Sequence, residues 1–286
     1  MRAVWSFWSK PYRAERAGTW AVPAMHWYSW ILSVETARRH LPDTCLYTDT
    51  EGANLLIDRL GLQFGEVSTA LDALKGEDPG WWALGKLYTY SLQPAPFVHI
   101  DSDVFLWKPL PDRMLTAGVF AQNPESLDIS YRPHCLEETL AQTDGTWLPA
   151  AWRWFRKQGT RQHAACCGIL GGSNLPLLRD YARKALKMVR HPANRRALDH
   201  FEDKIGNMIL IEQYFLSACL AYRHEPPEYL FESWEQATNP AYSTERGYTH
   251  LIGPAKRDEW IARRLEARVR QEFPGLSAVV PQMVAA

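Results

Sequence analysis

Two carboxylates, Asp101 and Asp103, follow a short apolar run in the sequence. The run covers residues 97–100, and apolar residues resume at Val104. Both aspartates have solution pKa values of about 4, so both are ionised at neutral pH and repel each other. A divalent cation relieves this repulsion, and carboxylate oxygens suit Mg²⁺ or Mn²⁺. The pair therefore predicts a metal site at the end of a strand, although aspartates also stabilise turns without any metal.

A second group of residues with chemical potential lies far along the chain. His250, Gly253 and Lys256 occur within the segment His-Leu-Ile-Gly-Pro-Ala-Lys. A single histidine is more often a packing residue than a ligand, but the glycine here permits close approach of the backbone to a ligand. The lysine is a compact cation suited to a phosphate. Such a group could stabilise a departing diphosphate as its negative charge grows.

The two segments, HIDSDVF and HLIGPAK, resemble motifs of nucleotide-sugar glycosyltransferases with the GT-A fold, especially glycosyltransferase family 8 and its relatives. In that family the aspartates of the DxD motif and the histidine of the HxxGxxK segment are metal ligands, and the lysine contacts the donor phosphates. The resemblance implies that Asp101, Asp103 and His250 bind Mn²⁺ or Mg²⁺, and that Lys256 contacts the diphosphate. Where the family usually continues with Pro-Trp, this chain has Arg257-Asp258.

The same resemblance implies roles for further residues. Glu212 and Gln213 are similar to an acidic-Gln pair that faces the reacting sugar, so with Lys256 they are the candidate catalytic residues. The candidate donor-binding residues are Ser6, Trp8, Asp49, Lys86, Asp101, Ser102, Gly171, Gly172, Asn174, Gly253 and Lys256. Simpler explanations remain open for several of them, because aromatic residues usually pack in the core and charged residues on helices are usually solvated.

These residues need a scaffold, which the apolar pattern predicts. Short strands are expected at residues 3–8, 44–48, 62–67, 97–100 and 164–170, and helices at 27–39, 53–60, 82–92, 176–189, 209–222 and 259–273. The alternation favours an α/β fold with a mostly parallel central sheet flanked by helices, in which ligands bind at the carboxyl ends of strands. The resemblance implies the GT-A fold. We expect a catalytic domain over residues 1–256, then an amphipathic helix and tail over 257–286.

The amino-acid composition limits which binding partners and which cellular compartment we expect. Lys+Arg and Asp+Glu both number 32, so the chain as a whole has no electrostatic attraction to nucleic acid. Its five cysteines show no metal-binding spacing, which favours reduced thiols. We see neither a signal peptide nor a stretch with the length of a membrane span. We expect a cytoplasmic protein, free or peripheral to the inner membrane face, that meets a nucleotide-sugar donor and a hydroxyl-bearing acceptor such as a carbohydrate.

The combined prediction is a metal-dependent glycosyltransferase, a hexosyltransferase that moves a sugar from a UDP-sugar to an acceptor hydroxyl. The family 8 resemblance implies that the anomeric configuration is retained. A nucleotide-sugar pyrophosphorylase would share the fold, but it should have a glycine-rich basic loop after the first strand. Residues 9–13 contain no glycine.

Two alternatives stay open. The segment from Asp101 to Val104 also fits the opening motif of haloacid-dehalogenase-like phosphatases, in which Asp101 would be the nucleophile. That class needs a later acidic pair at the end of another strand, and we identify none in the sequence. The other alternative is a non-catalytic sugar-nucleotide-binding protein, which would have no need to keep Asp101, Asp103, His250 and Lys256 together.

Overall fold

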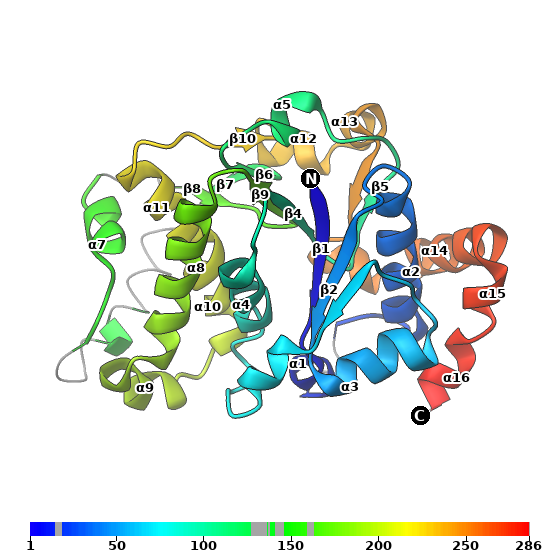
Figure 1. Ribbon diagram of the computed structural model, residues 1–286, viewed down its shortest axis with the longest axis horizontal. Helices are drawn as coiled ribbons and strands as arrows, with labels where there is room; N and C mark the ends of the chain where they lie inside the picture. Colours follow the sequence, from blue (N-terminus) through cyan, green and yellow to red (C-terminus); the bar gives the residue numbers. More distant parts are fainter. Residues whose placement is uncertain (15–18, 127–135, 137, 141–145, 159–162, 286) are drawn as a thin grey trace. The chain divides into compact units, whose positions relative to one another are not determined.

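The computed structural model describes residues 1–14, 19–126, 136, 138–140, 146–158 and 163–285 (Figure 1). The chain divides into two compact units. The first consists of Met1–Lys75, Val98–Leu110 and Pro240–Ala286, and the second of Gly76–Phe97 and Pro111–Asn239. Cys135, one of the five cysteines, lies outside the described residues. The expected domain boundary after residue 256 stays a prediction.

In the first unit, strands and helices alternate along the chain. Its elements are β1 (Arg2–Phe7), α1 (Ser9–Ala14), α2 (Ala24–Arg38), β2 (Thr44–Thr48), α3 (Thr50–Ala53), η1 (Asn54–Arg59), β3 (Glu66–Ser68), η2 (Ala70–Leu74), β4 (Phe97–Ile100), β5 (Val104–Leu106), α13 (Pro240–Arg246), β11 (Tyr248–His250), η4 (Gly253–Arg257), α14 (Glu259–Glu272), α15 (Pro274–Ser277) and α16 (Val280–Ala285). The expected strands at 44–48 and 97–100 coincide with β2 and β4. The expected strand at 62–67 is shorter, because the Leu62 N–H bonds to the Leu56 carbonyl and closes the preceding helix instead.

The sheet of the first unit has the strand order β4-β1-β2-β3. β1 and β2 are parallel, with Ala3 opposite Thr44 and Phe7 opposite Thr48, and β2 and β3 are also parallel. Every residue of β2 and β4 is buried. Continuous burial is expected of strands that are covered on both faces, and it agrees with the absence of Asp, Glu, Lys and Arg from β2 and β4.

The second unit contains the remaining elements. They are α4 (Leu84–Leu92), α5 (Asp112–Leu115), β6 (Phe120–Ala121), β7 (Pro124–Ser126), α7 (Ala150–Arg156), β8 (His163–Ala165), β9 (Ile169–Gly172), α8 (Leu175–Arg190), α9 (Pro192–Asp199), α10 (Lys204–Ile209), η3 (Leu210–Tyr214), α11 (Phe215–Tyr222), β10 (Glu228–Tyr229) and α12 (Trp234–Thr238). β10 is parallel to β6, whereas β6 is antiparallel to β9 and β7 to β8. The predicted α/β class is confirmed. The expected mostly parallel sheet is confirmed only in part, because parallel and antiparallel pairs are mixed.

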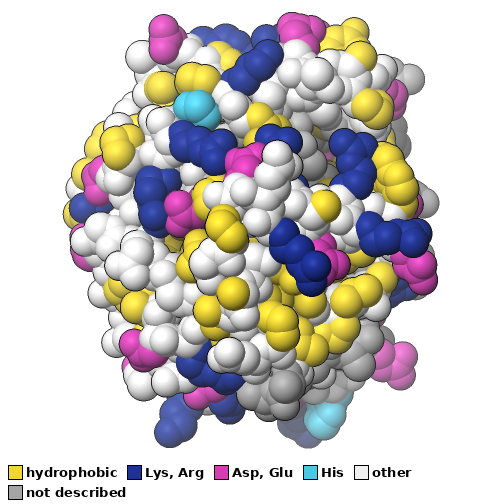
Figure 2. All heavy atoms as spheres, turned by 90° about the vertical axis from the view of Figure 1, so that its right-hand side faces the viewer, with side chains coloured by type: hydrophobic (Ala, Val, Ile, Leu, Met, Phe, Trp, Pro, Cys, Tyr) yellow, Lys and Arg dark blue, Asp and Glu magenta, His cyan; other side chains and the backbone are white. Residues whose placement is uncertain are grey.

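The expected C-terminal amphipathic helix is α14. Its buried residues Ala262, Leu265 and Val269 recur at helical spacing, so one stripe of the helix faces the core. Figure 2 views the side of Figure 1 on which α14 to α16 lie, and it shows Lys and Arg side chains interspersed with acidic and hydrophobic ones. Among the described residues, no helix combines the length and the apolar character needed to cross a bilayer.

Candidate metal centre

A short antiparallel pair of strands brings the two candidate motifs together. β5 pairs with β11 so that Val104 lies opposite His250, and the Leu251 N–H donates to the Asp103 carbonyl at 3.0 Å. Residues that face each other across such a pair have Cα atoms about 5 Å apart. The pairing therefore places His250 beside the turn that carries the two aspartates. One potential ligand atom from each of Asp101, Asp103 and His250 lies within 4.8 Å of the others.

Asp103 is the electrostatic centre of this group. Asp103 is 5% exposed, and its carboxylate has two close neighbours: Lys256 Nζ is 2.5 Å from Oδ2, and His250 Nε2 is 3.4 Å from Oδ1. Burial opposes ionisation, but the charge of Lys256 and the interactions with Lys256 and His250 outweigh it and hold the Asp103 pKa well below its ordinary value. The repulsion expected between the two aspartates is thus offset within the protein, chiefly by Lys256.

The turn that carries Asp101 is fixed by its backbone. The Asp101 carbonyl accepts hydrogen bonds from Ser33 Oγ–H at 2.9 Å and from the Val104 N–H at 3.0 Å. Ser33 belongs to α2, and its Oγ in turn accepts a hydrogen bond from the indole N–H of Trp5 on β1. Because two neighbouring elements hold the same turn, the Asp101 side chain projects from a rigid position. That side chain is 22% exposed and so remains accessible.

His99 is a member of the site that the sequence did not suggest. It is 1% exposed, its Nδ1 lies 3.6 Å from Asp101 Oδ1, and its Nε2 lies 2.9 Å from the Ser6 hydroxyl. A buried imidazole between a hydroxyl and a carboxylate can orient that carboxylate, as partners of metal ligands often do. Ser6, which we expected to bind the donor, contacts His99. The available signal was a polar residue inside the otherwise apolar β4.

Two aromatic residues of the first unit lie near the Lys256 ammonium. Its Nζ is 5.4 Å from the ring centroid of Trp20. His26, which stacks on Tyr12 at 4.5 Å, has its pKa lowered to about 3, first by burial and then by the charge of Lys256. The His26 imidazole is therefore neutral at pH 7, and its enclosed Nε2 has no hydrogen-bond partner among the described residues. Neither Trp20 nor His26 belongs to a motif that could have been recognised from the sequence.

The other expected donor-binding residues of the first unit have structural roles that the geometry makes clear. Asp49, which is 8% exposed, caps α3 by accepting the Gly52 N–H at 2.7 Å, and it also accepts the Ser9 N–H at 3.0 Å and the Ser9 hydroxyl at 2.8 Å. Trp8 is buried. Gly253 begins η4 with φ of +51°, a conformation that glycine adopts readily. Contact of any of these residues with a donor, and of Ser102 in the turn, stays a prediction.

The second unit holds a buried ion pair. Lys86 on α4 and Glu212 on η3 are 2.8 Å apart, with side chains 9% and 0% exposed. Lys86 also donates to the Cys167 carbonyl at 3.1 Å, and Tyr181 donates to the backbone carbonyl of Glu212 at 2.7 Å. The simpler explanation of these two charges, a solvated helix surface, is therefore wrong. η3 is a π-helical turn, a feature often found at functional sites, but action of Glu212 and Gln213 on a sugar stays a prediction.

The Gly171-Gly172-Ser173-Asn174 run forms a close strand-to-helix turn. Gly172 has φ of +143°, and a Cβ there would lie 2.0 Å from the Gly118 carbonyl oxygen, so only glycine fits. Asn174 caps α8 by accepting the Leu177 N–H at 3.2 Å. Local backbone packing thus accounts for both residue types. Contact of this turn with a donor sugar stays a prediction.

The fold and the site together define an α/β protein with a carboxylate–histidine group that could hold a metal ion. Over residues 1–282 the chain matches the model of a family described as "Family of unknown function (DUF6734)", and it belongs to that family. A search of curated proteins finds no match to this sequence.

Proposed function

We propose that the protein is a metal-dependent glycosyltransferase of the GT-A type, which transfers a hexosyl group from a UDP-sugar to an acceptor hydroxyl. One observation carries the proposal. Asp101 and Asp103 meet His250 and Lys256 in a single cluster, although the two pairs are far apart in sequence. These are the four residues that the resemblance to glycosyltransferase family 8 assigns to the metal and the diphosphate.

The donor set fits a divalent cation. Two carboxylates and one imidazole supply oxygen and nitrogen ligands, which suit Mn²⁺ and can accommodate Mg²⁺. Asp103 is ionised and buried, so its charge requires a positive partner, which Lys256 provides in the protein alone. A bound cation would supply positive charge beside the departing diphosphate.

The protein's own residues have separable tasks in this proposal. Lys256 has a flexible stem and is 23% exposed, so its ammonium can turn from Asp103 to a donor phosphate and stabilise the charge that grows there. Ser6 holds the His99 ring, and the ring in turn orients the Asp101 carboxylate beside it. Retention of the anomeric configuration, and the parts of Glu212 and Gln213, belong to the same proposal.

Two other functions use the same cluster differently. A phosphatase with Asp101 as nucleophile would explain the partly exposed Asp101, but it gives His250 no task. A sugar-nucleotide-binding protein would use the cluster without turnover. These alternatives predict, respectively, release of phosphate from phosphate monoesters, and binding of a UDP-sugar with no release of UDP.

The test is chromatographic measurement of UDP released from a panel of UDP-sugars, with and without Mn²⁺. We expect slow release that depends on Mn²⁺, stops with a chelator, and is lost in His250→Gln. His200→Gln, at an exposed position of the second unit, is the matched control and should behave like the parent. Release that is indifferent to the chelator or to His250→Gln would overturn the proposal.

A further inference from the structure

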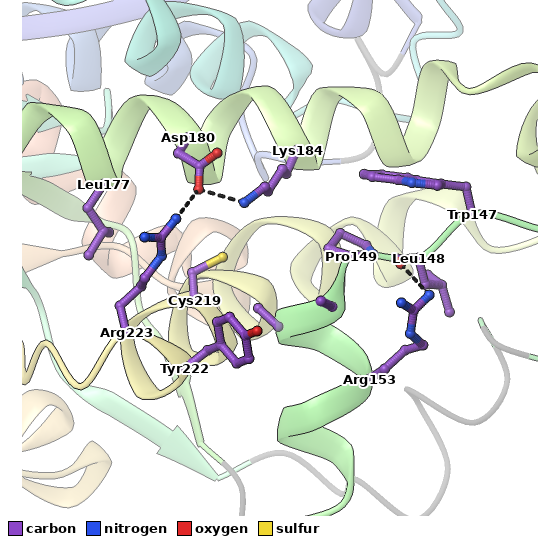
Figure 3. A pocket seen from close by; sticks show the side chains of 12 residues that line it. Trp147, Leu148, Pro149, Arg153, Leu177, Asp180, Lys184, Cys219, Tyr222 and Arg223 are labelled. Carbon is purple, nitrogen blue, oxygen red and sulfur yellow. Dashed lines mark hydrogen bonds and ion pairs between the residues drawn. The ribbon is translucent and has the colours of Figure 1, made fainter.

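A cavity in the second unit shares no residue with the candidate metal centre. It has a volume of about 360 Å³ and lies between α7, α8 and α11 (Figure 3). None of the residues that line it belongs to the metal-capable group. Its volume falls within the range of about 300–1,000 Å³ that is usual for small-molecule sites. The chemistry of its walls indicates what it could hold.

Three cationic side chains line the cavity against one acidic side chain. Lys184 Nζ and Arg223 Nη2 both contact Asp180 Oδ2, at 2.6 Å and 3.1 Å, so the two cations are held close to each other (Figure 3). The third, Arg153, donates from Nη1 to the Leu148 carbonyl at 2.9 Å. An arginine has five N–H donors and a lysine three. Several donors therefore remain for a ligand, and the excess of positive charge favours an anion.

Aromatic rings form the other part of the wall. The backbone of Trp147 is fixed by Asn194, which exchanges two hydrogen bonds of 2.7 Å with it and is completely buried. The Trp147 ring itself lies 4.3 Å from Lys187 Nζ and stacks on His191 at 5.6 Å. Tyr222 also lines the cavity. A fixed indole and a phenol ring offer flat surfaces on which a ring of a ligand can stack.

We propose that this cavity binds a small organic anion in which a phosphate or carboxylate is attached to a ring. Lys184 and Arg223 hold the anionic group from one wall, and Trp147 and Tyr222 contact the ring. Asp180 contacts both cations before binding, which brings their side chains to the same part of the wall. The proposal does not depend on the function proposed for the metal centre.

The experiment is isothermal titration calorimetry of the full-length protein at low salt. The probes are phenyl phosphate, benzoate, glucose 6-phosphate and glucuronate, with phenol and glucose as the neutral counterparts. We expect at least one anion to bind, its neutral counterpart not to bind, and the affinity to fall as salt is added. The pairs of probes distinguish phosphate from carboxylate and an aromatic ring from a sugar. If phenol or glucose binds as tightly as the anions, or if no anion binds, the proposal is overturned.

Variants place the binding in the cavity. The double change Lys184→Gln and Arg223→Gln removes two charged donors and should lower the affinity for the anion by about tenfold or more. The matched control is Arg183→Gln, on the same helix but exposed and outside the cavity lining, and it should leave the affinity unchanged. Trp147→Leu should lower the affinity for phenyl phosphate more than the affinity for inorganic phosphate. Equal affinity in the parent and the double variant would overturn the proposal, and the salt dependence of the parent tests it independently of any variant.

Discussion

Replacing Asp103 by Asn tests the electrostatics of the candidate metal centre. The change keeps the shape of the side chain but removes the charge that Lys256 contacts at 2.5 Å and His250 at 3.4 Å. Breaking a fully buried ion pair costs about 3–5 kcal/mol, but Lys256 is 23% exposed and can regain water. We therefore expect the free energy of unfolding at pH 7 to fall by about 1–3 kcal/mol. If only the repulsion between the two aspartates mattered, as the sequence alone suggests, removing one charge would leave the free energy of unfolding unchanged or slightly raised.

The pH dependence of this loss has a definite sign. The pKa of Asp103 is lower in the folded protein than its value of about 3.9 in an unfolded chain. A carboxylate whose pKa is depressed on folding adds stability above the unfolded value, and this stability is lost as the pH falls towards the folded value. The difference between the parent and Asp103→Asn should thus be constant near neutrality and shrink as the pH falls below about 4.

Urea unfolding of the parent and the variant at several pH values is the assay. Asp58→Asn, at an exposed carboxylate of η1, is the matched control and should show neither the loss nor the pH effect. The same proteins can be melted with UDP and Mn²⁺, because a ligand at a hundred times its dissociation constant adds about 2.7 kcal/mol to the folded state. That gain should vanish in Asp103→Asn. An unchanged or raised stability of the variant without ligand would refute the reasoning about Lys256.

Other parts of the structure make predictions of their own. Lys86→Met leaves the fully buried Glu212 without its cation, so we expect the free energy of unfolding in urea to fall by about 3–5 kcal/mol. The double variant that also carries Glu212→Gln should lose less, and equal losses in the two variants would contradict a buried ion pair. The pKa of His26 is about 3 in the folded protein and about 6.5 in the unfolded chain, so the unfolded chain takes up a proton at higher pH. The free energy of unfolding of the parent should therefore fall by on the order of 2 kcal/mol from pH 7 to pH 5, and His26→Phe should lack this fall. Gly172→Ala should lower the melting temperature strongly, because the added Cβ would overlap a backbone oxygen. Gly76→Ala, where the space around the glycine is open, should not, and equal effects of the two changes would contradict the described turn.

Local sequence patterns predicted much of the first unit. The stretches at 44–48 and 97–100, which have no Asp, Glu, Lys or Arg, matched β2 and β4, because strands buried on both faces exclude such residues. The two motifs that we expected to share one metal ion do lie together, through the pairing of β5 with β11. The antiparallel pairing of β6 with β9 was not predicted, because strand direction is set by long-range contacts that leave little trace in such short segments.

Several tertiary contacts could not be predicted from the sequence. Ser33 reaches Asp101 only because α2 packs beside the turn, and it forms no spacing pattern with the aspartates. His99 precedes Asp101 by two residues, but nothing local shows that its ring is buried against Ser6 of β1. Lys86 and Glu212 were candidate donor-binding and catalytic residues, but their ion pair was not predicted, since nothing local indicates that the two helices bury them against each other. Patterns of residue type reveal which groups could do chemistry, but packing decides which of them meet.

The central claim is that His250 and the two aspartates hold one divalent ion. Pulsed electron paramagnetic resonance of the protein with Mn²⁺ tests this directly, because a coordinated imidazole nitrogen modulates the manganese signal. We predict nitrogen modulation in the parent and in His200→Gln, and its disappearance in His250→Gln while weaker Mn²⁺ binding by the carboxylates remains. A bound Mn²⁺ without nitrogen modulation in the parent, or with modulation that persists in His250→Gln, would contradict the account.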